Sequence, residues 1–120
     1  MIRTYVPEGG DLIWLDFTPQ AGREQVGRGP AVVLSPRTYN RRTRLAIVCT
    51  VTTQVKGYPF EISLPETSPI TGVVLADHLR NLDWQARRAE KAGRVPRQVM
   101  AEIRERIAAL LVLAAHKEGH

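Results

Sequence analysis

A glycine-rich loop holds the charged residues whose types best suit phosphate chemistry. Between Gly22 and Gly29 the sequence places one carboxylate, Glu24, and two guanidiniums, Arg23 and Arg28. A carboxylate can accept a proton and a guanidinium can neutralise a phosphate, so Glu24 and Arg28 would suit a general base beside a phosphate clamp. A solvated loop whose charges carry no chemistry fits the same residues equally well. The apolar run that follows, Ala31 to Leu34, must lie inside a core.

Hydroxyl and basic side chains further along the chain offer more contacts for an anion. Thr52 and Thr53 end a β-branched run, where they are either plain strand formers or hydroxyl donors to a phosphate. Trp84 could stack on a base, although packing in the core explains it as well. The surrounding basic residues could either follow a nucleic-acid backbone or form a solvated surface: Arg80, Arg87, Arg88, Lys91 and Arg94.

Composition and missing motifs disfavour several other functions. The sequence has no P-loop and no hydrolase order of Ser, His and Asp, and its 3 histidines are too scattered for a metal site, so no metal or cofactor is expected. Its 1 cysteine, Cys49, lies in an apolar run, and we find neither a signal peptide nor a run of ~20 apolar residues. We therefore expect a cytoplasmic protein without a membrane segment. A net charge of +5 favours an anionic partner, such as nucleic acid or an acidic protein.

Five or six short strands have to position these groups. Alternating or β-branched apolar patterns predict strands at Asp11–Phe17, Ala31–Ser35, Leu45–Thr53, Phe60–Leu64 and Val73–Leu82. The last of these segments starts as a strand and continues either as a strand or as a short turn. The polar segment between the first two strands, residues 18–29, is predicted as a loop. The basic segment from Arg37 to Arg44 is predicted as a turn.

One long helix completes the predicted fold. We expect it from Pro96 to Ala115, because proline suits a first helical turn and apolar residues recur every three or four positions: Val99, Met100, Ile103, Ile107, Leu110, Leu111 and Ala114. The strands follow one another without helical crossovers, which argues against a parallel α/β fold. The sequence therefore predicts a single domain, residues 1–120, that is mainly β: a small β-barrel carrying one helix.

Several blocks of this sequence resemble the MazF/PemK family of toxin endoribonucleases from type II toxin–antitoxin systems. The blocks keep the family's order and near-identical spacing over most of the chain, which makes the resemblance specific. They are Y-V-P at 5–7, G-D-L-I-W-L-D-F at 10–17, E-Q-V-G at 24–27, P-A-V-V-L-S-P at 30–36, T-T-Q-V-K-G-Y-P-F-E at 52–61 and G-V-V-L-A-D at 72–77.

The family resemblance implies a fold, an activity and partners. The fold is an SH3-like barrel of five to seven strands with a long C-terminal helix, and the protein is a homodimer. The activity is sequence-specific, metal-independent cutting of single-stranded RNA, which leaves 2′,3′-cyclic phosphate and 5′-hydroxyl ends and halts translation and growth. The toxin is inhibited by an acidic, MazE-like antitoxin whose tail occupies the RNA groove.

The resemblance also implies site residues. Thr52 and an arginine at position 29 would be the catalytic pair. From the chemistry of metal-free RNA cleavage, we expect the arginine to stabilise charge, Thr52 to donate a hydrogen bond to a phosphate oxygen and Glu24 to accept a proton. This chain instead has Gly29, preceded by Arg28. The implied RNA-binding residues are Phe17, Gln25, Gly27, Thr53, Gln54, Lys56, Arg80 and Arg87.

Gly29 leaves three explanations open. Arg28 replaces the missing guanidinium, the chain is catalytically weak, or the glycine was introduced to make a lethal toxin producible. Losing one pre-organised donor typically costs about 10²–10³ in rate, so the sequence predicts RNA binding with slow cleavage or none. A non-catalytic module that binds RNA or sequesters an antitoxin is an alternative. A gyrase poison like CcdB is disfavoured, because that function uses a C-terminal tryptophan and this chain ends in His-Lys-Glu-Gly-His.

Overall fold

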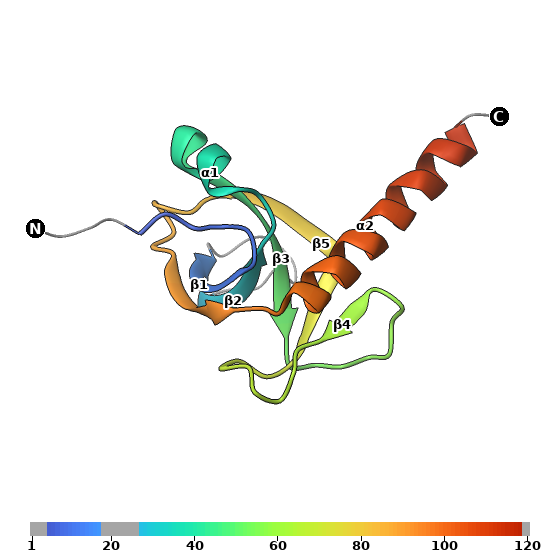
Figure 1. Cartoon of the computed structure of the whole chain (residues 1–120), viewed down its shortest axis with the longest axis horizontal. Coiled ribbons are helices and arrows are strands. Elements are labelled where there is room, and N and C mark those ends of the chain that lie inside the picture. Colours follow the sequence, from blue (N-terminus) through green and yellow to red (C-terminus); the bar gives the residue numbers. More distant parts are fainter. Residues whose placement is uncertain (1–4, 18–26, 119–120) are drawn as a thin grey trace, which may run out of the picture.

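The computed structural model describes residues 5–17 and 27–118, with side chains up to 112, and within them the chain forms six strands and two helices (Figure 1). The elements are β1 (Asp11–Phe17), β2 (Gly27–Val33), α1 (Arg37–Thr43), β3 (Leu45–Thr52), β4 (Glu61–Ser63), β5 (Val73–Asp83), β6 (Glu90–Arg94) and α2 (Arg97–Glu118). The strands form one antiparallel sheet in the order β4-β5-β3-β2-β1-β6. The sheet curls into a half-barrel, so the predicted mainly β fold with a C-terminal helix is confirmed.

Strand alternation divides the buried side chains between the two faces of this curled sheet. One cluster contains Leu12 and Val32 and is covered by the first turns of α2 through Met100 and Ile103. The other cluster comes from the intervening positions: Ile13, Leu15, Phe17, Ala31, Val33, Val48 and Leu82. We call the face that carries this second cluster the inner face. Its polar continuation forms the site described below.

Several strand boundaries differ from the sequence prediction, and β6 (Glu90–Arg94) was not predicted as a strand. The second strand begins at Gly27 instead of Ala31, because pairing with β1 continues through Leu15↔Gly29 and Phe17↔Gly27. Glycine has a low strand propensity, so the local pattern alone placed the start of this strand too late in the chain. The β5 segment that could have been a turn is a strand up to Asp83, held by its pairing with β3.

The basic segment predicted as a turn is the short helix α1. Its only buried residue is polar, which is why no apolar stripe revealed it: the Asn40 amide donates to the carbonyls of Pro7 (2.9 Å) and Ser35 (3.0 Å). The helix ends at Arg44, whose left-handed φ of 63° lets its N–H reach the Asn40 carbonyl. The same carbonyl accepts a hydrogen bond from the Trp84 indole, so Trp84 is a packing residue, 6% exposed.

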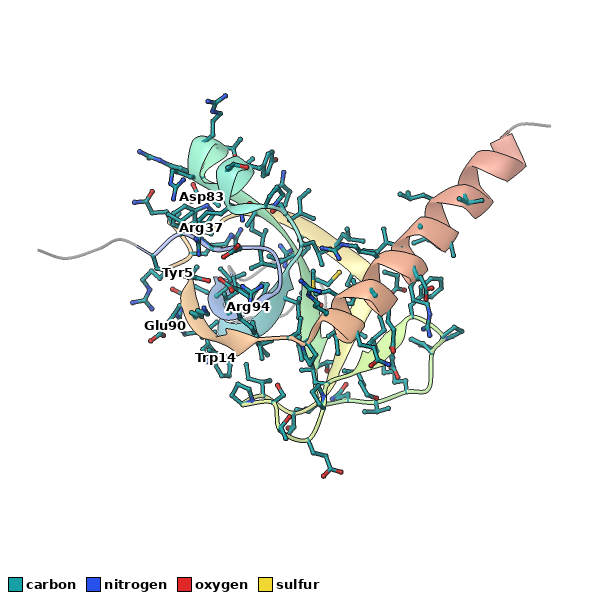
Figure 2. All side chains as sticks on the ribbon, viewed as in Figure 1. Tyr5, Trp14, Arg37, Asp83, Glu90 and Arg94 are labelled. Atoms are coloured by element: carbon teal, nitrogen blue, oxygen red, sulfur yellow. The ribbon has the colours of Figure 1, made fainter. Side chains whose placement is uncertain are left out.

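A buried carboxylate holds the N-terminal segment against β6. Asp11 is fully buried and accepts hydrogen bonds from the Arg94 guanidinium (2.7 Å), the Tyr5 hydroxyl and the Glu8 N–H (3.0 Å). Burial, together with this carboxylate, raises the pKa of the Tyr5 hydroxyl well above its usual range. Figure 2 shows Tyr5 and Arg94 at the same side of the molecule.

The C-terminal half of α2 does not pack as its apolar pattern predicts. Val99, Met100 and Ile103 are buried, but Leu111 is 64% exposed and Val112 65% exposed. Leu110, also predicted on the buried stripe, lies at the surface. The helix runs past the edge of the sheet and projects away from the body of the domain, so no part of the described chain covers its later turns (Figure 1).

Candidate active site

The register of β2 and β3 places position 29 and Thr52 on the same face of the sheet. Ala31 pairs with Thr50, and side chains two residues along a strand return to the same face. Position 29, two residues before Ala31, and Thr52, two residues after Thr50, therefore both belong to the inner face. The sequence could not show this, because the two positions are brought together only by strand pairing.

One basic side chain of β5, that of Arg80, lies on the same inner face. Arg80 pairs with Val48, whose side chain belongs to the inner-face cluster. The Arg80 guanidinium lies over the ring of Phe17, 5.5 Å from its centroid, which is within range of a cation–π contact. The structure thus brings together Phe17, Arg80 and Thr52, three of the predicted site residues.

A groove of about 750 Å³ opens where β3, β5 and the turn after β3 meet. Its walls include four of the predicted residues, Thr52, Gln54, Lys56 and Arg80, and also His78, Tyr58 and Glu61, which the sequence analysis did not select. Predicted Thr53 is exposed next to it but is not part of its lining. The groove therefore combines a hydroxyl, an amide and two cationic groups, which are the group types that bind a nucleic-acid backbone.

Hydrogen bonds fix the turn that forms one wall of this groove. The Glu61 carboxylate accepts the backbone N–H groups of Lys56 and Gly57, both at 2.9 Å. The Thr52 hydroxyl oxygen accepts the N–H of Gln54 at 3.1 Å. Because a hydroxyl both accepts and donates, this bond leaves the Thr52 proton available for an acceptor in the groove.

Arg28 points away from this site. It pairs with Asp16 across β1 and β2, one residue out of phase with Gly29, so its side chain lies on the opposite face of the sheet. There its guanidinium donates to Asp16 Oδ1 (2.9 Å), Glu90 Oε1 (3.1 Å) and the carbonyl of Arg88 (2.7 Å). Figure 2 shows Glu90 on the side of the molecule formed by β6.

Comparison with known proteins decides the family. A family model described as the PemK-like, MazF-like toxin of type II toxin–antitoxin systems matches residues 8–111. The chain belongs to this family. It is 46% identical to the endoribonuclease toxin MazF of Escherichia coli strain K12 over 111 residues, which cover 92% of this chain and 99% of that protein. The resemblance stated from the sequence blocks is thereby confirmed.

Solved MazF structures agree in fold with this PemK/MazF-family chain. MazF from Deinococcus radiodurans superposes with a TM-score of 0.85 at 56% identity, covering 90% of this chain and 98% of that one. A MazE–MazF structure from the same organism gives a TM-score of 0.81 at 50% identity, covering 90% of this chain and 97% of that one. The half-barrel with a C-terminal helix is therefore the MazF fold.

A charged cluster that no sequence pattern indicated connects the end of β1 and the start of β2 to the turn before β6. Asp16, just before the loop, accepts from Arg88 Nε (2.6 Å) as well as from Arg28, just after it. These hydrogen bonds, first from Arg88 and then from Arg28, lower the pKa of the Asp16 carboxyl. Arg88 adopts a left-handed φ of 52°, which is uncommon for a non-glycine residue.

The remaining predicted site residues either contact the backbone next to the loop, begin β2, or lie outside the residues that the structure describes. Arg87 was predicted to bind RNA. Its guanidinium donates to the Asp16 carbonyl (3.2 Å) and its own carbonyl accepts the Asp16 N–H (2.8 Å), so Arg87 stabilises the end of β1 next to the loop. Gly27 opens β2 with a left-handed φ of 79°. Glu24 and Gln25 lie outside the described residues, so their predicted roles stay predictions.

The described part of the chain offers neither a metal-binding cluster nor a membrane-spanning helix. In residues 5–17 and 27–118, His, Cys, Asp and Glu side chains form no group of three suited to a metal ion. Over the same residues, no helix combines the length and the apolar character needed to cross a membrane.

Proposed function

We propose that this chain is the toxin of a type II toxin–antitoxin pair and cuts single-stranded RNA. The observation that carries the proposal is the groove in which Thr52, Lys56 and Arg80 converge, on the same face of the sheet as position 29, in a chain of the PemK/MazF family. A family relative with 46% identity is named an endoribonuclease toxin, which supports the reaction class. Identity of this level over 92% of the chain supports carrying the reaction over.

The proposed reaction uses the ribose 2′-hydroxyl as the nucleophile. Its oxygen attacks the neighbouring phosphorus and the bond to the 5′-oxygen breaks, leaving a 2′,3′-cyclic phosphate and a 5′-hydroxyl. Thr52 donates a hydrogen bond to a non-bridging oxygen, while Arg80 and Lys56 offset the charge that grows on the phosphorane. Glu24, from the loop, is proposed to accept the 2′-proton.

Gly29 is proposed to make this chain a slow enzyme. Arg28 does not supply the missing guanidinium, because its side chain lies on the opposite face and is held there by Asp16 and Glu90. The absence of one oriented donor lowers the rate by about 10²–10³. Of the three explanations left open by the sequence, the geometry favours catalytic weakness over replacement by Arg28.

The proposed partners are an acidic antitoxin and a second copy of the chain. Solved MazE–MazF complexes of a 50%-identical relative and the net charge of +5 support an acidic antitoxin. Exposed Leu111 and Val112 on the projecting end of α2, with Leu79 at 41% exposure on β5, support a homodimer that buries them. The proposal places the protein in the cytoplasm, where its RNA substrate is found.

RNA cleavage in the presence of EDTA tests the proposed function. The chain and its Gly29→Arg variant would be incubated with a long single-stranded RNA, and cut sites and end groups mapped. We expect binding by both, slow cutting by the first, and about 10²-fold faster cutting by Gly29→Arg, with cyclic-phosphate ends. If neither protein cuts RNA, the proposed activity is wrong; EDTA-sensitive cutting would contradict the metal-free route.

A non-catalytic role is the second candidate, and Gly29 is the observation that favours it. A module that binds RNA or sequesters an antitoxin needs the groove but not the arginine. RNA binding without any cleavage, even by Gly29→Arg, would support this role.

A further inference from the structure

An irregularity in β5 turns His78 toward the groove. Cys49 pairs with Leu79, but Val51, only two residues further along β3, pairs with Val74. Thr50 therefore faces a bulged segment of β5, residues 75–78. Such bulges re-aim side chains and are frequent next to active sites. The bulge leaves the His78 side chain 58% exposed while its residue lines the groove with Thr50 and Thr52.

The charged surroundings of His78 come from three elements. On β5 itself, the Asp77 carboxylate lies 3.9 Å from His78 Nε2, and Arg80 lines the same groove. Lys56 and Tyr58 approach from the turn after β3, and Glu61 from β4, where its carboxylate is occupied by two backbone N–H groups. Acidic and basic side chains thus both surround the His78 imidazole.

We propose that His78 is the general acid of this chain's RNA cleavage. The inference rests on the proposed function and names a catalytic residue that the family resemblance does not supply. The 2′-oxygen loses its proton to the base and attacks phosphorus. As the bond from phosphorus to the 5′-oxygen breaks, protonated His78 delivers its proton to that oxygen, so a neutral 5′-hydroxyl leaves. Solvent then restores the proton on the imidazole.

The chemistry of the groove selects His78 for this step. Guanidinium stays protonated in proteins, so Arg80 can neutralise charge but transfers protons poorly. Histidine is the side-chain type whose ordinary titration falls between pH 5 and 8, which suits proton transfer at neutral pH. Among the described residues of the lining, the other ionisable side chains are those of Lys56, Tyr58, Glu61 and Arg80. Amines, phenols, carboxylic acids and guanidines ordinarily titrate farther from neutrality than imidazole does. With glycine at position 29, residual cleavage would depend on this imidazole.

A leaving-group experiment separates proton donation from a structural role. Once a cut site is mapped, the same RNA is prepared with sulfur in place of the 5′-bridging oxygen at that site. A thiolate leaves without protonation, so a missing general acid affects only the oxygen substrate. The test variant is His78→Gln, which keeps the polar character of the side chain, and the control is His116→Gln, a histidine near the end of α2.

We expect His78→Gln to cut the oxygen substrate about 10²-fold or more slowly than the parent chain, and the sulfur substrate within about threefold of it. His116→Gln should match the parent on both. Equal loss on both substrates would assign His78 a binding or structural role and overturn the proposal, as would no loss on either.

The Gly29→Arg protein separates this inference from the proposed function. If the parent chain cuts nothing while Gly29→Arg cuts RNA, the endoribonuclease function stands and the inference is overturned, because His78 then supports no cleavage in the chain that carries Gly29. If neither cuts, both are overturned. Cutting by the parent that is insensitive to His78→Gln overturns the inference alone.

Discussion

Replacing Asn40 by alanine should remove a large polar contribution to the stability of the fold. The Asn40 side chain is fully buried and joins three parts of the chain. Its Nδ2 donates to the carbonyls of Pro7 (2.9 Å) and Ser35 (3.0 Å), and its Oδ1 accepts the Ser35 hydroxyl (2.6 Å). Asn40→Ala removes all three bonds at once.

The expected loss follows from these contacts. Three hydrogen bonds at about 1 kcal/mol each give about 3 kcal/mol, and two buried carbonyls left without a donor, with a small cavity, raise the total to about 3–5 kcal/mol. Small domains are stable by only about 5–15 kcal/mol, so the change is a large fraction of the whole. The bonds of the Asn40 carbonyl to Trp84 and Arg44 are made by the backbone and remain.

Urea denaturation followed by circular dichroism would measure the difference. Asn81→Ala is the matched control, because Asn81 is exposed and its amide makes one bond, to the Tyr39 hydroxyl (3.1 Å). We expect the control to lose less than about 1 kcal/mol. A loss for Asn40→Ala no larger than that for Asn81→Ala would refute the stabilising role of the buried Asn40 side chain.

Three further predictions concern the site and the assembly. In the Gly29→Arg background, Arg28→Ala should keep the cleavage rate within about threefold while Thr52→Val lowers it about 10²-fold; equal losses would show that Arg28 faces the substrate. Because hydrogen bonds from Arg88 and Arg28 lower the pKa of Asp16, its ion pairs stabilise the fold above about pH 4 and are lost as the pH falls through the folded value. The stability gap between the parent and Asp16→Asn, measured in urea, should therefore shrink from pH 7 to pH 3, and a constant gap would contradict this cause. Leu111→Glu should reduce the sedimenting mass from dimer to monomer; an unchanged dimer would place the interface elsewhere.

Local patterns predicted most of the strands because each of them alternates or is β-branched. The Asp11–Phe17 strand was predicted with its exact bounds, and β3 to within one residue. The local patterns failed where tertiary contacts, and not a local signal, determine the element. Helix α1 is stabilised by buried Asn40 instead of an apolar stripe, and β2 extends through Gly27–Gly29 because β1 pairs with it.

The candidate site likewise contains residues that the sequence predicted and residues that only strand pairing brought into it. The sequence blocks were sufficient to select Thr52, Lys56 and Arg80, which the structure gathers in one groove. These blocks gave no reason to select His78, since its proposed role depends on a register shift in the pairing of β5 with β3. Asp16 was also missed, because its partners Arg28 and Arg88 lie 12 and 72 residues away in the chain.

The sequence by itself determined the family, the mainly β fold and the anomaly at position 29, because these depend on residue identity and on short-range periodicity. Only the tertiary structure decided which face of the sheet each charged group occupies. A shift of one residue along a strand moves a side chain to the opposite face. For that reason Arg28, next to Gly29 in sequence, lies across the sheet from Thr52, while His78 and Arg80, distant in sequence, lie beside it.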